Sequence, residues 1–291
     1  RDAMKQVTIL GLGVMGTSLG LALKQLKSPP SVVGCDVQYD AAQGATRLKA
    51  VDRIERDPLV AVRGSELVIL AAPVGAIQEL IQTIAPSLEH GSVVTDLGST
   101  KREIVRKGDE LLSPNAAFVG GHPMTGPTTA GVDGPSASIY SGAIYCLTPT
   151  ANTPPDAVQM VANMVHEIGA QAYFLDPSEH DGLVAAISHL PYLVSVAVMR
   201  CLAGQPGWRE MSTLAAGGFD TATRLSGSGA TMFADVLTTN ADNVARQLDR
   251  LVEELQSFKL KLLNRDPGIE RDLEEAQSLR RQWEEERRSK Q

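Results

Sequence analysis

The stretch Val7-Thr8-Ile9-Leu10-Gly11-Leu12-Gly13-Val14-Met15-Gly16 decides the fold of this 291-residue chain. An apolar, β-rich run enters the pattern GxGxxG and a helical pattern leaves it, which is how a dinucleotide-binding turn is built. We expect Gly11 to make the tight turn, Gly13 to let the backbone approach a diphosphate, and Gly16 to let helix and strand pack closely. The amides and the dipole at the start of the helix favour such an anion.

A carboxylate at the end of the second predicted strand selects the cofactor. Asp36 comes twenty residues after Gly16, where a carboxylate accepts hydrogen bonds from the adenosine ribose and repels a 2′-phosphate. We therefore predict NAD rather than NADP. Ala72 and Pro73 follow the next strand at the carboxyl edge of the sheet and are predicted to leave room for the nicotinamide, although they would also suit a plain turn.

The order of elements predicts an α/β protein whose N-terminal Rossmann-type, doubly wound parallel sheet is followed by an all-helical C-terminal domain. The predicted strands are 7–11, 32–36, 67–71, 93–96, 117–120, 143–148 and 172–175. Ser178, with Asp181 three residues later, resembles a capping box that opens the helical part, whose predicted helices are 178–200, 208–216, 230–263 and 269–290. We place the NAD-binding domain at residues 4–176 and the helical substrate domain at 177–291.

The composition narrows the classes of partner. A net charge of −7 argues against nucleic acid, which clustered Lys and Arg bind. We expect no membrane span, and Cys35, Cys146 and Cys201 predict buried, reduced thiols in a cytoplasmic protein without a metal site. The charged last helix carries an apolar stripe that suits either a solvated helix or dimer packing.

Two motifs supply candidate catalytic groups. Ser99 in DLGSTK (96–101) and His122 in GGHPMTG (120–126) each follow a predicted strand, so both should project from the rim that holds the cofactor. A dehydrogenase needs a hydrogen-bond acceptor on the substrate hydroxyl, and histidine is the usual choice near neutral pH. A loop histidine can equally make a structural hydrogen bond.

GLGVMG (11–16), DLGSTK, GGHPMTG, HDGLVAAISHLPY (180–192) and GGFDTATR (217–224), in this order, resemble the prephenate and arogenate dehydrogenase family over roughly residues 4–255. The resemblance implies a dehydrogenase of tyrosine biosynthesis that removes hydride and carbon dioxide from a cyclohexadienol. It also implies a homodimer formed through the helical domain. Tyrosine as a feedback inhibitor stays open.

The resemblance also implies roles for single residues. His122 matches the catalytic histidine, and Ser99 matches the serine that holds the ring hydroxyl and orients that histidine. Arg224 matches the arginine that binds the ring carboxylate, a role suited to a planar guanidinium. His189 lines the cleft beside Pro191, which should kink the helix. His180 lies in the predicted capping turn, where it can be only structural.

Three departures from the family pattern concern the substrate. Tyr192 and Asp220 stand where many prephenate enzymes carry positive charge, which favours the ammonium group of arogenate over the keto group of prephenate. Thr128 replaces a gating glutamate found in some members, so control of access at this loop is an open question.

Two alternatives belong to other classes. A β-hydroxyacid dehydrogenase of the 3-hydroxyisobutyrate type also begins with a GLGxMG loop, but it uses a lysine that the run 182–200 lacks. A catalytically inactive NAD-sensing protein would not turn over a cyclohexadienol.

Overall fold

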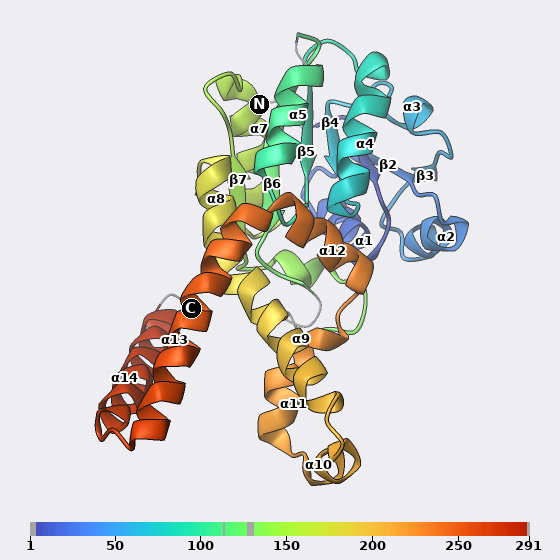
Figure 1. Ribbon diagram of the computed structural model, residues 1–291. Coiled ribbons are helices and arrows are strands. Elements are labelled where there is room, and N and C mark those ends of the chain that lie inside the picture. The colour runs from blue at the N-terminus through green and yellow to red at the C-terminus, as the bar shows by residue number, and fades with distance from the viewer. Residues whose placement is uncertain (1–3, 113, 127–130, 290–291) are drawn as a thin grey trace. The chain divides into compact units, whose positions relative to one another are not determined.

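The computed structural model describes residues 4–112, 114–126 and 131–289, and it divides into two compact units, Arg1–Ala241 and Asp242–Gln291. In the first unit, the described strands form one sheet in the order β3-β2-β1-β4-β5-β6-β7-β8, and Figure 1 shows β2 to β7 of this sheet. They are β1 (Gln6–Leu10), β2 (Ser31–Cys35), β3 (Arg53–Ile54), β4 (Leu67–Leu70), β5 (Ser92–Asp96), β6 (Ala116–Pro123), β7 (Ile144–Thr148) and β8 (Gln171–Phe174).

The predicted doubly wound α/β fold is confirmed, with one correction. Neighbouring strands are parallel except β6 and β7, which are antiparallel. A parallel crossover needs a helix-length connection, whereas the described residues between these strands contain only the short turn η2 (Ala137–Tyr140). The two-residue strand β3 was not predicted, because it is too short to show a periodicity.

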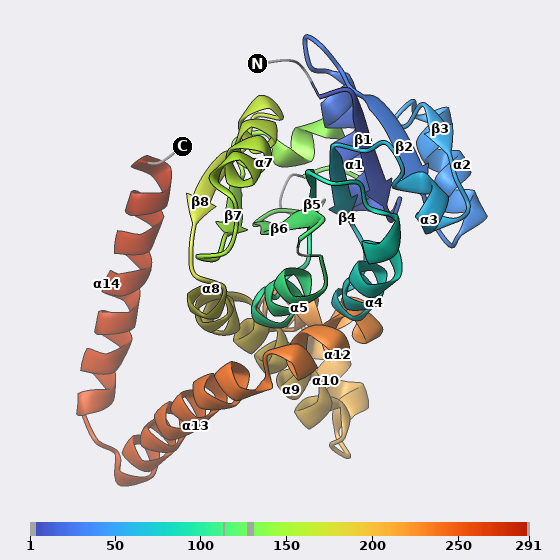
Figure 2. The ribbon, with the colours of Figure 1, turned by 90° about the horizontal axis from the view of Figure 1, so that it is seen from above.

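Helices cover both faces of the sheet because its strand residues alternate between two apolar cores. Val7 and Ile9 belong to the core that contains residues of α1, α2 and α7, and Leu10 belongs to the core that contains residues of α3, α4 and α5. Figure 2 shows α1 and α7 on one side of the sheet and α4 and α5 on the other. These helices are α1 (Val14–Lys24), α2 (Tyr39–Arg47), α3 (Pro58–Ala61), α4 (Val74–Ile84), α5 (Arg102–Leu112) and α7 (Pro155–Glu167); η1 (Ala85–Ser87) extends α4.

The strand order reverses between β1 and β4, and this switch point is where open α/β sheets bind ligands. The backbone N–H of Ala71 donates to the carbonyl of Leu10 at 2.7 Å, which places the ends of the two strands side by side. The glycine loop therefore meets the segment Ala71–Pro73 at the predicted crevice.

A continuous helical run follows the sheet. It consists of α8 (Pro177–Val184), the π-helical turn η3 (Ala185–His189) and α9 (Leu190–Ala203). The N-cap is Asp176, which accepts from the N–H groups of Ser178 and Glu179, so the predicted capping box at Ser178 is wrong. Pro191 lacks the N–H that a regular helix needs, which accounts for the irregular turn just before it.

Shorter helices complete the first unit: α10 (Trp208–Leu214), α11 (Gly217–Thr223), η4 (Arg224–Gly227) and α12 (Ala230–Thr239). The predicted helix 230–263 is broken at Asn240, whose side-chain amide donates to the carbonyl of Asp181 at 2.7 Å. The second unit contains α13 (Ala241–Asn264) and α14 (Gly268–Ser289), and Lys261 pairs with Asp272 between these two helices.

Two expectations from composition need correction. Cys201 is exposed, whereas Cys35 and Cys146 are buried as expected. By length and composition alone, the run Pro177–Ala203 is apolar enough to cross a membrane. Its buried residues His180 and Asp181 hydrogen-bond to residues of the α/β part, as expected of a helix packed on a protein core.

Candidate active site

The glycine loop has the geometry of a dinucleotide-binding turn. Gly11 has a φ of +103°, and a Cβ there would lie 2.2 Å from the carbonyl oxygen of Ala71, so no other residue fits. A Cβ on Gly16 would lie 2.0 Å from the carbonyl oxygen of Gly11. Around Gly13, in contrast, a Cβ would meet none of the described residues within 4 Å, and α1 begins there without a side-chain cap. Open space over an uncapped helix start suits a diphosphate.

Asp36 lies beside this loop, as the sequence predicts. Its carboxylate accepts from the N–H of Leu12 at 2.6 Å and from the N–H of Gln38 at 2.7 Å. A carboxylate offers about four lone-pair sites, so acceptor capacity is left for ribose hydroxyls. Contact of Asp36 with the ribose stays a prediction.

The loops after β4 and β5 meet at the same edge. The N–H of Leu97 donates to the carbonyl of Leu70 at 3.0 Å. Ala72 is half-buried, and Pro73 is the exposed N-cap of α4. Ser99 is half-buried, and its side chain makes no hydrogen bond to the described residues. The orientation of His122 by Ser99, which the family resemblance implies, is not seen in this structure.

His122, on β6, is instead held by a second histidine. Its Nδ1 lies 2.9 Å from Nε2 of His180, with the ring planes at 72°. On its other side, Nδ1 of His180 lies 2.8 Å from Oδ1 of Asp181. His180 and Asp181 are completely buried. His180 is therefore part of the candidate site. The sequence analysis had left open that it is only a structural residue of the capping turn.

Asp181 connects this chain of groups to the start of α5. Its two carboxylate oxygens accept from the N–H of Lys101 at 2.7 Å and the N–H of Arg102 at 3.0 Å. The start of a helix carries unpaired N–H groups and a partial positive charge, so it favours a carboxylate. This contact fixes α8 against α5.

A buried ion pair lies beneath the loop that carries His122. Lys101 Nζ donates to Asp96 and to the carbonyl of Gly121, the latter at 2.7 Å. Asp96 also accepts from the N–H groups of Gly98 and Gly121, at 2.8 and 3.0 Å. Burial raises the pKa of Asp96 and lowers that of Lys101, and their mutual attraction opposes both shifts. The pair ties the loop after β5 to the backbone beside His122.

The pKa values of two histidines are lowered, so both are neutral at pH 7. Burial lowers the pKa of His122 well below its usual value, and the electrostatic effects of His180, Lys101 and His189 lower it further. Burial likewise lowers the pKa of His189 to about 4. A neutral imidazole is the form that accepts a proton.

The Nε2–H group of His189 is a hydrogen-bond donor near Asp181. Asn240 Nδ2 donates to the carbonyl of Asp181 and lies 3.3 Å from Nδ1 of His189. Nδ1 of His189 is thus the acceptor, and the neutral ring carries its proton on Nε2. That Nε2 is buried and has no hydrogen-bond partner among the described residues. Because buried polar groups are normally paired, this N–H calls for an acceptor on a ligand or a water molecule.

Four other residues predicted to bind the substrate are not seen in contact with the histidine cluster. Arg224 and Asp220 are exposed. Tyr192 is buried and stacks on Phe233 with ring centroids 3.6 Å apart. Thr128 lies outside the described residues. The roles of these four residues stay predictions.

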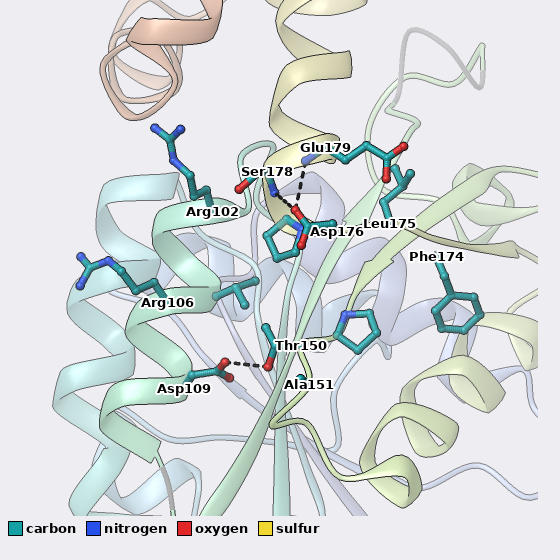
Figure 3. A pocket seen from close by; sticks show the side chains of 13 residues that line it. Arg102, Arg106, Asp109, Thr150, Ala151, Phe174, Leu175, Asp176, Ser178 and Glu179 are labelled. Carbon is teal, nitrogen blue, oxygen red and sulfur yellow. Dashed lines mark hydrogen bonds between the residues drawn. The ribbon is translucent and has the colours of Figure 1, made fainter.

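A pocket of about 590 Å³ lies between α5, the loop after β7 and the start of α8 (Figure 3). Thr150 donates there to Asp109 at 2.8 Å, and Asp176 caps α8. None of the predicted site residues that the structure describes lines this pocket. It is therefore separate from the histidine cluster.

Four functional candidates were missed by sequence reasoning: Asp96, Lys101, Asp181 and Asn240. Three of them stand within the quoted motifs DLGSTK and HDGL. Asp96 at the end of a buried strand, followed five residues later by Lys101, could have predicted an internal ion pair. No sequence pattern predicted the role of Asn240, because its contacts with Asp181 and His189 depend on the break between α12 and α13.

A doubly wound sheet, a dinucleotide turn at its switch point and a neutral histidine at the same edge define a nucleotide-dependent oxidoreductase. The prephenate dehydrogenase nucleotide-binding domain model matches residues 19–174, and the prephenate dehydrogenase dimerization domain model matches residues 176–274. The prephenate dehydrogenase of Bacillus subtilis (strain 168) is 31% identical over 261 residues, covering 89% of this chain and 70% of that protein. The chain therefore belongs to the prephenate dehydrogenase family.

Solved structures agree with this assignment. The crystal structure of Synechocystis arogenate dehydrogenase is similar with a TM-score of 0.80 at 26% identity, covering 96% of this chain and 99% of that chain. Prephenate dehydrogenase from A. aeolicus, in complex with hydroxyphenyl propionate and NAD⁺, has the same fold, with a TM-score of 0.87 at 24% identity and coverage of 97% and 99%. The predicted family and the predicted NAD-dependent dehydrogenase are confirmed, and the 3-hydroxyisobutyrate alternative is less supported.

Proposed function

We propose that this enzyme catalyses the oxidative decarboxylation of prephenate or arogenate with NAD, and that His122 is its catalytic acceptor. One observation carries the assignment of His122. It is a neutral, half-buried histidine at the cofactor edge of the sheet, held through its Nδ1, while its Nε2 makes no hydrogen bond to the residues that the structure describes. Such a ring can accept a hydrogen bond or a proton from a hydroxyl.

The reaction balances without a further oxidant. When NAD is bound, it accepts the hydride from C4 of the cyclohexadienol. His122 takes the C4 hydroxyl proton as that carbon is oxidised. The C1–carboxylate bond then breaks, carbon dioxide leaves, and its electron pair makes the ring aromatic, so that the proton returns to the phenol oxygen. Aromatisation draws the oxidation forward, and the protein contributes mainly orientation and proton acceptance.

Each part of NAD and of the substrate can be matched to a residue with suitable chemistry. The open space at Gly13 and the carboxylate of Asp36 suit a diphosphate and a ribose without a 2′-phosphate. The buried Nε2–H of His189 suits a substrate oxygen. Arg224 is proposed for the ring carboxylate because a guanidinium binds a carboxylate in a bidentate manner.

A homodimer formed through the helical region is part of the proposal. The region that matches the dimerization domain, 176–274, includes α9, whose apolar side chains are mostly not buried within this chain. A second copy would cover such a face. We also propose a cytoplasmic location, which would keep the thiols of Cys35, Cys146 and Cys201 reduced.

Initial rates with prephenate and with arogenate, each with NAD and with NADP, test the proposal. We expect NADH formation that matches carbon dioxide release, and much slower turnover with NADP because Asp36 repels the extra phosphate. Adding tyrosine to the same assay tests it as an inhibitor. Binding of NAD without turnover of either substrate would instead support the inactive NAD-sensing alternative.

A further inference from the structure

The start of α5 determines the charge state of Asp181. Both oxygens of this buried carboxylate accept from backbone N–H groups, those of Lys101 and Arg102. Backbone N–H groups can only donate, so Asp181 must offer lone pairs on both sides. The helix dipole favours the ionised form at this place.

The acceptor at Asp181 determines which nitrogen of His180 carries the proton. Because Oδ1 of Asp181 is an acceptor 2.8 Å away, Nδ1 of His180 must donate. A neutral imidazole with its proton on Nδ1 has its lone pair on Nε2, and in His180 this Nε2 faces Nδ1 of His122 at 2.9 Å. One proton must lie between these two histidines, so it belongs to Nδ1 of His122.

We infer that Asp181 is a positioning residue that acts through His180 to hold the proton of His122 on Nδ1, leaving Nε2 of His122 as the acceptor for the substrate hydroxyl. This inference rests on the proposed function for the role of His122, but the position of the proton does not depend on it. With the other tautomer, Nε2 of His122 would carry a hydrogen and could not accept one.

The same chain of groups stabilises the charge that the reaction creates. When Nε2 of His122 takes the hydroxyl proton, the positive charge lies one histidine away from the carboxylate of Asp181. The bond between His122 Nδ1 and His180 Nε2 strengthens as His122 becomes positive. The carboxylate itself stays out of reach of the substrate, because it is completely buried against α5.

Asp181→Asn tests the inference, because a carboxamide has only one acceptor. Oδ1 of Asp181 serves both the N–H of Lys101 and Nδ1 of His180, and Oδ2 serves the N–H of Arg102. With its NH₂ group in the place of Oδ1, the amide gives Nδ1 of His180 a donor, so His180 carries its proton on Nε2 and donates to Nδ1 of His122, whose own proton moves to Nε2. With its NH₂ group in the place of Oδ2, His180 and His122 keep their tautomers and kcat stays close to that of the wild type. The change of tautomer should lower kcat about 10²- to 10⁴-fold, as for a wrong histidine tautomer in other relays, with the Kd for NAD unchanged.

Long-range ¹H–¹⁵N spectra of ¹⁵N-histidine-labelled protein report the tautomer directly, and a His122→Asn spectrum assigns the signals. We expect Nδ1–H on His122 in the wild type, and Nε2–H on His122 in Asp181→Asn wherever its kcat has fallen. If Asp181→Asn does not fold, His180→Asn removes the same link while Asp181 keeps its contacts with α5, and kcat should again fall at least tenfold.

Asp176→Asn is the matched control, because Asp176 also accepts from two backbone N–H groups of α8 but touches neither histidine. It should weaken the helix cap and leave kcat and the His122 tautomer unchanged. The inference is wrong if wild-type His122 carries its proton on Nε2, or if kcat falls in Asp181→Asn without a change of tautomer. These spectra need no substrate, so they decide the inference even if neither cyclohexadienol is turned over.

Discussion

Two regions of the first unit differ in whether their polar side chains already have hydrogen-bond or ion-pair partners. In the relay cluster, formed by His122, His180 and Asp181, each residue is hydrogen-bonded to another member of the cluster. In the recognition segment, 217–227, the side chains of Asp220 and Arg224 are exposed and make no ion pair with the described residues. The hydrogen bonds of the first region are made before a ligand arrives, whereas the charges of the second region are still available.

This difference suggests a division of labour. Groups that handle a proton must keep one tautomer and one distance, which side chains that are hydrogen-bonded to one another provide. Groups that capture a charged substrate need free hydrogen-bonding capacity, which exposed arginine and aspartate retain. Substitutions in the relay cluster should therefore change kcat, and substitutions in the recognition segment should change KM or the choice of substrate.

The largest effect is expected for His122→Asn. Turnover should fall about 10²- to 10⁴-fold, the scale of a positioned acid or base, while the fold and NAD binding persist because the carboxamide is small and polar. Initial rates and NAD titration measure this. His166→Asn, at an exposed position on α7, is the control and should be fully active. Full activity of His122→Asn would refute the assignment of the catalytic acceptor.

A smaller effect, on KM, is expected for Arg224→Ala. Arg224 is exposed, and a bidentate contact with a carboxylate belongs at the upper end of exposed ion pairs, about 1 kcal/mol, so the KM for the cyclohexadienol should rise roughly fivefold, with kcat changed far less. Arg209→Ala removes an equally exposed arginine from α10 and should leave KM unchanged. If Arg224→Ala lowers kcat and spares KM, the recognition segment takes part in the chemical step and the contrast with the relay cluster fails.

The two regions also differ in what the sequence could predict. The glycine loop was predictable because its requirements are local: Gly11 needs a positive φ, and Gly16 must approach backbone. The strands were recognisable because apolar runs and glycine-marked ends are short-range patterns. The two-residue strand β3 and the antiparallel step at β7 were not, because they depend on the path of the chain rather than on periodicity.

The relay cluster was only half predictable. His122 was identified from its place after a strand, but its partner His180 is 58 residues away and the contact between Lys101 and Asp181 spans 80 residues. Such pairs follow from how α8 packs against α5, which no local spacing encodes. The sequence placed Asp181 in a capping box with Ser178, because the pattern is identical whether the carboxylate caps its own helix or the start of another.

The smallest effect concerns the choice between prephenate and arogenate. We predict a preference for arogenate, because Asp220 offers its ammonium group a carboxylate while Tyr192 offers no positive charge to a keto acid. Asp220 is exposed, and exposed ion pairs contribute about 0.2–1 kcal/mol, so Asp220→Asn should narrow the arogenate-to-prephenate ratio of kcat/KM by roughly fivefold at most. Glu210→Gln, which removes an exposed carboxylate from α10, controls for the overall charge and should leave the ratio unchanged. Paired kcat/KM measurements at low ionic strength give the ratio, because salt screens an exposed pair. A wild type that prefers prephenate, together with an unchanged ratio in Asp220→Asn, would show that this carboxylate does not face the substrate side chain.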